Sequence, residues 1–255
     1  MKKILFALAV FAAASQTVLA HDDLKAAIAH PQRSPENVAR DGARHPYETL
    51  KFFGVEGKST VVELSPGAGW YTEILAPYLR KDGKLILAGA GAKLKAKLDA
   101  LPAVYDKAVY GEFSPGKKID YAPKNSVDFV LTFRNVHNWT SASDSAVKEV
   151  FQSAFDALKP GGVFGVVEHR LPVAMEQNAK ASTGYVHEAF VIKLAESVGF
   201  KLAAKSEVNA NPNDDAKHEG GVWALPPVLT NKEKDKAKYM AIGESDRMSL
   251  KFVKP

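Results

Sequence analysis

The 255-residue sequence contains no cysteine. No disulfide can stabilise the chain, so its fold depends on a hydrophobic core, which a domain of this length normally provides. A large excess of one charge is also missing, because 34 Lys and Arg stand against 29 Asp and Glu. A formal net charge of +5 does not favour nucleic-acid binding. With 46% apolar and 25% charged residues, the composition excludes a disordered chain and a collagen-like fibre.

A hydrophobic run as long as a membrane span is also missing. The N-terminal apolar run covers residues 4–14, directly after Lys2 and Lys3. It is shorter than the roughly 20 residues that a spanning helix needs. Residues 15–20 follow this run and end in the small residue Ala20. The pattern therefore predicts a signal peptide over residues 1–20, cleaved ahead of His21. We therefore expect an exported, periplasmic protein without a stable membrane anchor after cleavage; a retained anchor is the alternative.

Repeats, low-complexity blocks and long linkers are absent from the rest of the sequence, which predicts one domain with an N-terminal extension. The extension, residues 21–55, is expected to hold three short helices, two of which begin at a proline. The remainder, residues 56–255, is the main domain. Charged residues of the extension are either surface groups or part of a lid over a site, and the sequence leaves both open: Arg40, Asp41, Arg44 and His45.

Short apolar runs alternate with helical stretches from residue 60 onward. The predicted strands are 60–64, 84–88, 107–110, 127–133 and 163–168, and the helices between them are 70–79, 92–101 and 143–158. Because crossovers between parallel strands are right-handed and place helices on both faces, this order predicts a doubly wound, mainly parallel α/β sheet. The C-terminal part is expected to add a helix over 185–198, a strand over 200–208, a capping box at 230–233 that opens a last helix, and a strand over 248–253.

A glycine-rich turn follows the first predicted strand, in the sequence Glu63-Leu64-Ser65-Pro66-Gly67-Ala68-Gly69-Trp70. In an open α/β sheet, ligands bind beyond the carboxyl ends of the strands. Glycine lets the backbone approach a ligand closely, and the next helix offers free N–H groups and the positive end of its dipole. The turn is therefore interpreted as a cofactor-binding loop.

Three motifs in this order resemble those of class I S-adenosylmethionine-dependent methyltransferases. Glu63-x-Ser65-x-Gly67-x-Gly69 is similar to the family's first motif, residues 128–131 to its fourth strand, and residues 158–162 to its turn into the fifth strand. The likeness spans residues 55–205 and implies a seven-stranded Rossmann-like sheet with an antiparallel last strand. It also implies S-adenosylmethionine as cofactor, held by Glu63, Ser65, Gly67, Gly69, Trp70 and Asn135.

A narrower resemblance rests on the leader together with Gly-Ala-Gly-Trp-Tyr-Thr, Arg-Asn-Val-His-Asn-Trp and Gly-Glu-Ser-Asp-Arg-Met. These segments look similar to a group of exported bacterial proteins described as predicted methyltransferases.

Two positions depart from the family pattern. Ser65 replaces the first glycine, a change that is tolerated if its φ is negative. The end of the second strand, residues 87–91, holds no Asp or Glu to accept hydrogen bonds from the ribose hydroxyls. Losing such a bond costs about 1.5–3 kcal/mol, or about tenfold to a hundredfold in affinity. Either another group replaces the carboxylate or the pocket binds something else.

His137 follows the fourth predicted strand, His169 follows the fifth, and His187 opens the next helix, so the fold would bring all three to one crevice. A neutral histidine can remove a proton from an oxygen or nitrogen nucleophile near pH 7. We expect His137 or His169 to act as the base, with Glu168 orienting it. The residues expected to contact the substrate are Asn138, Trp139 and His187. Each of these histidines, taken alone, is also compatible with a core or surface position.

A metal site is the alternative use of these side chains. The imidazoles could hold a transition metal together with Glu168 or Glu188, and an N-terminal His21 could chelate copper. No HxH or HxxxH pair occurs, so no metal site is predicted. The predicted function is an exported methyltransferase for an unidentified small molecule. A non-catalytic or metal-associated periplasmic binding protein on the same scaffold is the alternative.

Overall fold

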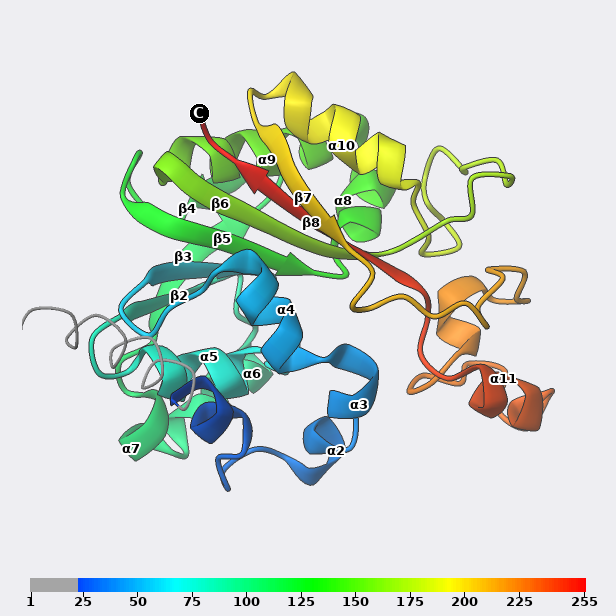
Figure 1. Ribbon diagram of the computed structural model, residues 1–255, viewed down its shortest axis with the longest axis horizontal. Coiled ribbons are helices and arrows are strands. Elements are labelled where there is room, and N and C mark those ends of the chain that lie inside the picture. The colour runs from blue at the N-terminus through cyan, green and yellow to red at the C-terminus, as the bar shows by residue number, and fades with distance from the viewer. Residues whose placement is uncertain (1–22) are drawn as a thin grey trace, which may run out of the picture.

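The computed structural model describes residues 23–255, so the predicted signal peptide and its cleavage site lie outside the described residues. An eight-stranded sheet forms the centre of the protein, in the order β4-β3-β2-β1-β5-β6-β8-β7 (Figure 1). Its strands are β1 (Thr60–Leu64), β2 (Lys84–Ala88), β3 (Val109–Ser114), β4 (Lys118–Asp120), β5 (Val127–Phe133), β6 (Leu158–His169), β7 (Lys201–Ser206) and β8 (Arg247–Val253).

The central strands β3, β2, β1, β5 and β6 run parallel, whereas β8 is antiparallel to both of its neighbours, β6 and β7. The predicted doubly wound, mainly parallel sheet is confirmed, with eight strands instead of seven. The additional strand, β4, pairs antiparallel with β3 over three residues at the edge of the sheet. A strand this short has no periodic pattern that distinguishes it from a turn.

Helices cover both faces of the sheet (Figure 1). Alternate residues of β1 point to opposite faces, so Val61 joins one core and Val62 the other. The core containing Val61 packs against α4 (Pro46–Phe53), α5 (Thr72–Leu79), α6 (Ala92–Asp99) and α7 (Pro102–Tyr105). The core containing Val62 packs against α8 (Val136–Ala142), α9 (Asp144–Ala157) and α10 (Glu188–Ser197).

The N-terminal extension is helical, as predicted. Helical turns cover residues 23–28, and α2 (Pro35–Val38) and α3 (Asp41–Arg44) precede α4. No helix within residues 23–255 combines the length and the apolar character needed to cross a membrane.

The predicted capping box at residues 230–233 is wrong. The last helix, α11 (Lys236–Ile242), begins later, after Asp235 with φ of 55° and no side-chain cap. The Thr230 N–H instead donates to the Trp223 carbonyl oxygen at 2.9 Å, and the Asn231 amide donates to the Glu219 carbonyl oxygen at 2.7 Å. Tertiary contacts therefore use the polar groups that the sequence pattern assigns to a helix start.

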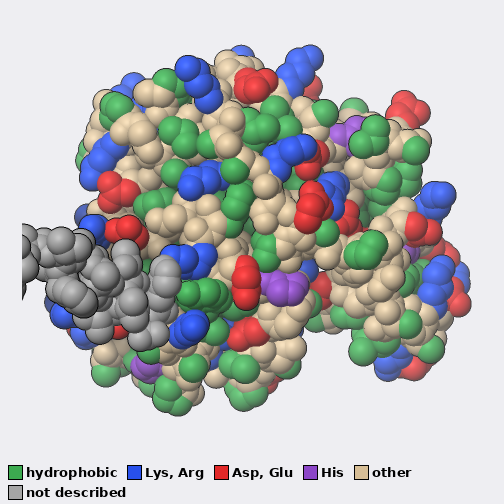
Figure 2. Space-filling model, viewed as in Figure 1, with side chains coloured by type: hydrophobic (Ala, Val, Ile, Leu, Met, Phe, Trp, Pro, Cys, Tyr) green, Lys and Arg blue, Asp and Glu red, His purple; other side chains and the backbone are tan. Residues whose placement is uncertain are grey.

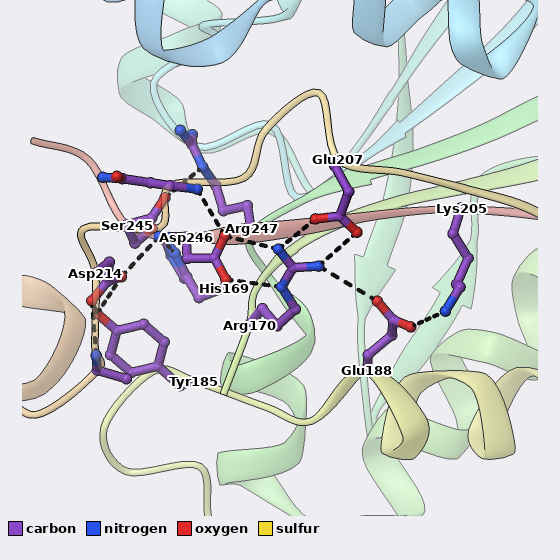
Figure 3. Close-up of polar contacts among 12 residues, drawn as sticks. His169, Arg170, Tyr185, Glu188, Lys205, Glu207, Asp214, Ser245, Asp246 and Arg247 are labelled. Atoms are coloured by element: carbon purple, nitrogen blue, oxygen red, sulfur yellow. Dashed lines mark hydrogen bonds and ion pairs between the residues drawn. The ribbon is translucent and has the colours of Figure 1, made fainter. Parts of the chain in front are cut away.

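Residues 207–246 connect β7 to β8 and form a lobe beside the sheet (Figure 1). This connection contains the 3-10 helix η1 (Gly221–Ala224) and α11. Arg170, just after β6, joins the two ends of the connection: its guanidinium donates to Glu207 at 2.7 and 2.9 Å and to Asp246 at 2.8 and 3.0 Å (Figure 3). Since bidentate Arg–carboxylate pairs fix geometry, Arg170 holds the lobe against the sheet. Positive and negative side chains are interspersed on the visible face of the protein (Figure 2).

Candidate functional site

A cavity of about 310 Å³ lies beyond the carboxyl ends of β1, β5 and β6. Ligand pockets in proteins begin at about this size. The glycine-rich turn after β1 and the loops after β5 and β6 form its floor and one side, and residues 222–228 of the lobe form another. The N-terminal extension completes the wall with Asn37, Arg40 and Arg44. Several separate parts of the chain therefore line one space at the ligand-binding edge of the sheet.

The backbone of the glycine-rich turn is held in the left-handed region. Ser65 has φ of 49°, so the condition under which serine replaces glycine here without strain is not met. The Ser65 N–H donates to the Ala88 carbonyl oxygen at 2.8 Å and thereby fixes the turn to the end of β2. Arg134, at the end of β5, also has a positive φ, of 63°. Each such residue costs about 1–2 kcal/mol, and such strain is concentrated at functional sites.

The two glycines of the turn have different roles. A Cβ on Gly67, whose φ is 59°, would meet no atom within 4 Å, and Gly67 lines the cavity. A Cβ on Gly69 would lie 2.5 Å from Leu94 Cδ1. Gly69, whose φ is 85°, therefore packs closely against α6 and does not line the cavity. Of the two, Gly67 is the position where the backbone is open to a ligand.

Glu63 lies beneath the turn and outside the cavity. Its side chain is buried, and the Thr72 hydroxyl donates to Glu63 Oε2 at 2.7 Å. Burial raises the pKa of Glu63 to about 8, and the hydrogen bond from Thr72 only partly opposes this shift. The structure thus places the predicted cofactor-binding acid in the core, where it connects β1 to α5.

Replacing Glu63 by glutamine is expected to stabilise the protein at alkaline pH. Between pH 4.5 and 8 the carboxyl group ionises in the unfolded chain but remains protonated in the folded one, so wild-type stability falls as pH rises through this range. Glu63→Gln keeps an acceptor for Thr72 and removes this loss, which is on the order of 4 kcal/mol at pH 8. Urea unfolding at pH 5 and pH 8 measures the difference. The exposed Glu56→Gln is the control, and an equal effect of Glu63→Gln at both pH values would contradict the assignment.

Asn135 fastens the glycine-rich turn to the end of β5. Its side-chain amide nitrogen lies 3.2 Å from the Leu64 carbonyl oxygen, 3.3 Å from that of Ser65 and 3.2 Å from the Thr132 hydroxyl. Asn135 lines the cavity, as expected of a cofactor-binding residue, but its donor group is used within the protein. It positions the turn, and only its carbonyl oxygen remains for a ligand.

His137 and Glu168 form a buried pair at the cavity wall. His137 Nδ1 lies 2.9 Å from Glu168 Oε1. Glu168 also accepts hydrogen bonds from the backbone N–H groups of Val136, His137 and His169, so its carboxylate is fixed in place. Because a carboxylate only accepts hydrogen bonds, Nδ1 carries the proton and Nε2 has a free lone pair. His137 lines the cavity, and an imidazole oriented in this way is suited to act as a base.

His169 lines the same cavity but has a different partner. Its Nδ1 lies 2.6 Å from the Ser245 hydroxyl, and its ring centre is 5.4 Å from that of His137. Burial lowers the pKa of His169 well below its usual value, and the charge that His137 carries when protonated and the charges of nearby arginines act in the same direction. His169 therefore stays neutral at pH 7 and serves as a hydrogen-bonding group. Of the two histidines considered as base, His137 has the geometry for it.

The remaining predicted site residues are divided between the cavity and the interior. Trp70 and Asn138 line the cavity. Trp70 donates from Nε1 to the Asn37 carbonyl oxygen at 2.9 Å, and the guanidinium groups of Arg33 and Arg44 lie over its ring. Trp139 is buried against Phe113, with ring centres 5.8 Å apart, and does not line the cavity.

His187 also lies away from the cavity. Its ring Nε2 is 2.9 Å from the Met175 carbonyl oxygen, and its backbone N–H donates to the side-chain oxygen of Gln177. The structure therefore does not bring the predicted substrate-contacting residues Trp139 and His187 to the site.

The end of β2 also lies outside the cavity. Gly89 and Gly91 are exposed there, and residues 87–91 do not contribute to the cavity lining. The cavity is centred over β1, β5 and β6, on the other side of β1. The position where the resembling family places its ribose-binding carboxylate is thus separate from the enclosed space.

Arg40 and Arg44, two of the possible lid residues, lie in a cluster around Glu244. The sequence did not predict Glu244 itself or the other arginines of this cluster, Arg134 and Arg247. Arg40 Nε and Arg44 Nε donate to Glu244 at 2.6 and 3.2 Å, and Arg247 Nη1 donates to it at 3.1 Å. Arg134, which lines the cavity, adds a fourth cation. Glu244 comes just before β8, and because β8 is antiparallel, its first residues lie at the same edge as the carboxyl end of β6. A search for polar residues before the predicted last strand would have found Glu244 and Ser245.

Of the four charged residues of the N-terminal extension that could be surface groups or part of a lid, two line the cavity and two do not. Arg40 and Arg44 line the cavity, so they form part of its wall. Asp41 instead pairs with Arg33 at 2.7 Å, and His45 does not line the cavity.

No protein-family model and no curated protein matches the sequence. Solved structures do match in fold. A SAM-dependent methyltransferase from Aquifex aeolicus is 18% identical with a TM-score of 0.55, over 74% of this chain and 93% of that one. The [4+2]-cyclase SpnF is 14% identical with a TM-score of 0.61, over 95% of each chain.

Phosphoethanolamine N-methyltransferase 2 from Haemonchus contortus, in complex with S-adenosyl-L-methionine, is 15% identical with a TM-score of 0.57, over 83% of this chain and 52% of that one. At these identities the likeness establishes the class I methyltransferase fold. The cyclase among the matches shows that other chemistry also uses this fold.

Proposed function

We propose that the protein is an S-adenosylmethionine-dependent methyltransferase that acts on a small molecule after export to the periplasm. One observation carries the proposal: the open backbone at Gly67 and the carboxylate-held imidazole of His137 line the same cavity. The fold supports the cofactor, since class I methyltransferases are among its structural neighbours. The apolar N-terminal run after Lys2 and Lys3 supports export.

The residues around the cavity fit the cofactor in part. The segment from Ser65 to Ala68 provides exposed backbone, and Gly67 leaves room for close approach. A carboxylate for the ribose hydroxyls is absent at the end of β2, so groups within the cavity must supply acceptors instead. The side-chain oxygens of Asn37 and Asn138 are suitable acceptors that line it.

S-adenosylmethionine, when bound, supplies an electrophilic methyl group. The protein's own residues position the acceptor and handle its proton. His137 Nε2 takes the proton from an oxygen or nitrogen nucleophile, and Glu168 stabilises the resulting imidazolium. Residues 222–228 cover the cavity and reduce the access of water.

Calorimetry with S-adenosylhomocysteine, the product form of the cofactor, tests the proposal. Gly67→Asp is expected to weaken binding at least tenfold, because the new carboxylate would occupy the open space above the turn. Gly161→Asp is a matched control, since Gly161 also has a positive φ and open space around its Cβ position. Gly161 lies near the start of β6, at the end of the strand away from the cavity. Absence of binding by the wild type, or equal loss in both variants, would contradict the proposal.

A metal-associated binding protein is the second candidate function, and one cluster favours it. Ligand atoms of His137, Glu168 and His169 all lie within 4.8 Å of one another. Calorimetry with zinc and copper separates the two functions: metal binding that His169→Ala abolishes, without any nucleoside affinity, would support the binding protein.

A further inference from the structure

Two arginines that line the cavity have buried side-chain nitrogens without a hydrogen-bond partner among the described residues. Arg44 is 2% exposed, and both of its Nη atoms are buried without a partner among the described residues. Nη2 of Arg40 is in the same state. An unpaired buried donor costs about 1–3 kcal/mol, and more when it is charged. Since both arginines line the cavity, a ligand in it is able to satisfy these donors.

Positive charge at this place also exceeds negative charge. Arg40, Arg44 and Arg247 share a single carboxylate, that of Glu244, and Arg134 adds a further cation. Glu168, the carboxylate behind His137, is already engaged by that imidazole and by backbone N–H groups. The cluster therefore has an excess of three positive charges. Arg44 and Arg247 are buried, and buried charges are normally paired, so the geometry calls for a ligand that brings negative charge.

S-adenosylmethionine does not supply the negative charge that would balance these arginines. Its amino-acid part brings an ammonium together with its carboxylate, and its sulfonium adds another positive charge. An acceptor with two or three negative charges balances the cluster better, and planar guanidinium groups bind phosphate and carboxylate oxygens in pairs.

We propose that Arg40, Arg44 and Arg134 form the subsite for an anionic group, phosphate or carboxylate, of the small molecule on which the protein acts. That this molecule is a methyl acceptor rests on the proposed function, whereas the anion subsite does not. Residues of the N-terminal extension thereby select the substrate, while the sheet supplies the glycine-rich turn and His137. The extension is thus part of the specificity apparatus.

Binding of pyrophosphate, phosphate and citrate to the protein without nucleoside tests the subsite, with sodium chloride at equal ionic strength as reference. The wild type is expected to bind at least one of these anions. Arg40→Gln and Arg134→Gln should each weaken that binding about tenfold, as expected for the loss of one charge-assisted contact. Arg80→Gln, which removes an exposed guanidinium paired with Asp106, should have no effect. No anion binding by the wild type, or the same affinity in all variants, would overturn the proposal.

A second arm identifies the source of the anionic group. S-adenosylhomocysteine carries a carboxylate, and 5′-methylthioadenosine lacks it. If Arg40→Gln and Arg134→Gln bind both nucleosides as the wild type does, the arginines serve the substrate, as proposed. If they lose affinity for S-adenosylhomocysteine alone, the arginines recognise the cofactor and the assignment to the substrate fails. A wild type that binds anions but neither nucleoside would support the subsite and refute the proposed methyl transfer.

Discussion

Replacing Glu244 by alanine is expected to lower the free energy of unfolding by about 3–5 kcal/mol. The carboxylate is 10% exposed and is the shared partner of Arg40, Arg44 and Arg247. Its removal leaves these guanidinium groups close together without the charge that offsets their mutual repulsion. Urea unfolding at pH 7 measures the loss. Glu112→Ala, which breaks the exposed pair with Lys118, should cost less than about 1 kcal/mol.

The Glu244 carboxylate should also make the free energy of unfolding fall at acidic pH. Burial alone would raise the pKa of Glu244, but the positive charges of Arg44, Arg247 and Arg40 outweigh it and lower the pKa to about 2. Because the pKa is lower in the folded chain than the value of 4.5 in the unfolded one, this stabilisation is present above pH 4.5 and is lost as pH falls to 2. Its size is on the order of 3 kcal/mol. A Glu244→Ala variant with the same acid dependence as the wild type would contradict the assignment.

His137→Ala is expected to reduce the rate of methyl transfer by about 100- to 10,000-fold, the usual contribution of a general base. Glu168→Gln should also slow the reaction, because a neutral amide no longer fixes the Nδ1–H tautomer or stabilises the imidazolium. Formation of S-adenosylhomocysteine, with an acceptor found by screening, gives the rate. Affinity for S-adenosylhomocysteine itself should change little.

The control for this experiment is His187→Ala, which removes a histidine that lies outside the cavity. It should retain wild-type rates. Equal rates for His137→Ala and the wild type would assign the pair to structure alone and would remove His137 from the mechanism.

Local sequence patterns were sufficient to predict the sheet and most of its helices. The apolar runs at β1, β2 and β5 have the same bounds in the structure, because buried parallel strands are encoded by the chain's own hydrophobicity. The start of α11 was missed, since the groups of Thr230 and Asn231 are used in contacts with η1 and the loop before it. Such contacts depend on the three-dimensional arrangement and leave no periodic trace.

The sequence predicted those site residues that directly follow a strand. Ser65, Gly67 and His137 follow β1 and β5 directly, and the rule for ligand positions in α/β sheets locates them. The pairing of Arg44 with Glu244 was missed because the two residues are 200 positions apart in the sequence and meet only when the extension packs against the start of β8. Glu63 matched a family motif, but its environment, a buried position under Thr72, is a property of the fold.

A crystal structure of the protein soaked with S-adenosylhomocysteine shows whether the cavity is the cofactor site. We expect electron density for the nucleoside in the cavity, in contact with the backbone from Ser65 to Ala68 and on the side that His137 faces. An empty cavity at saturating nucleoside, or density at the end of β2 that leaves Gly67 and His137 untouched, would contradict this expectation.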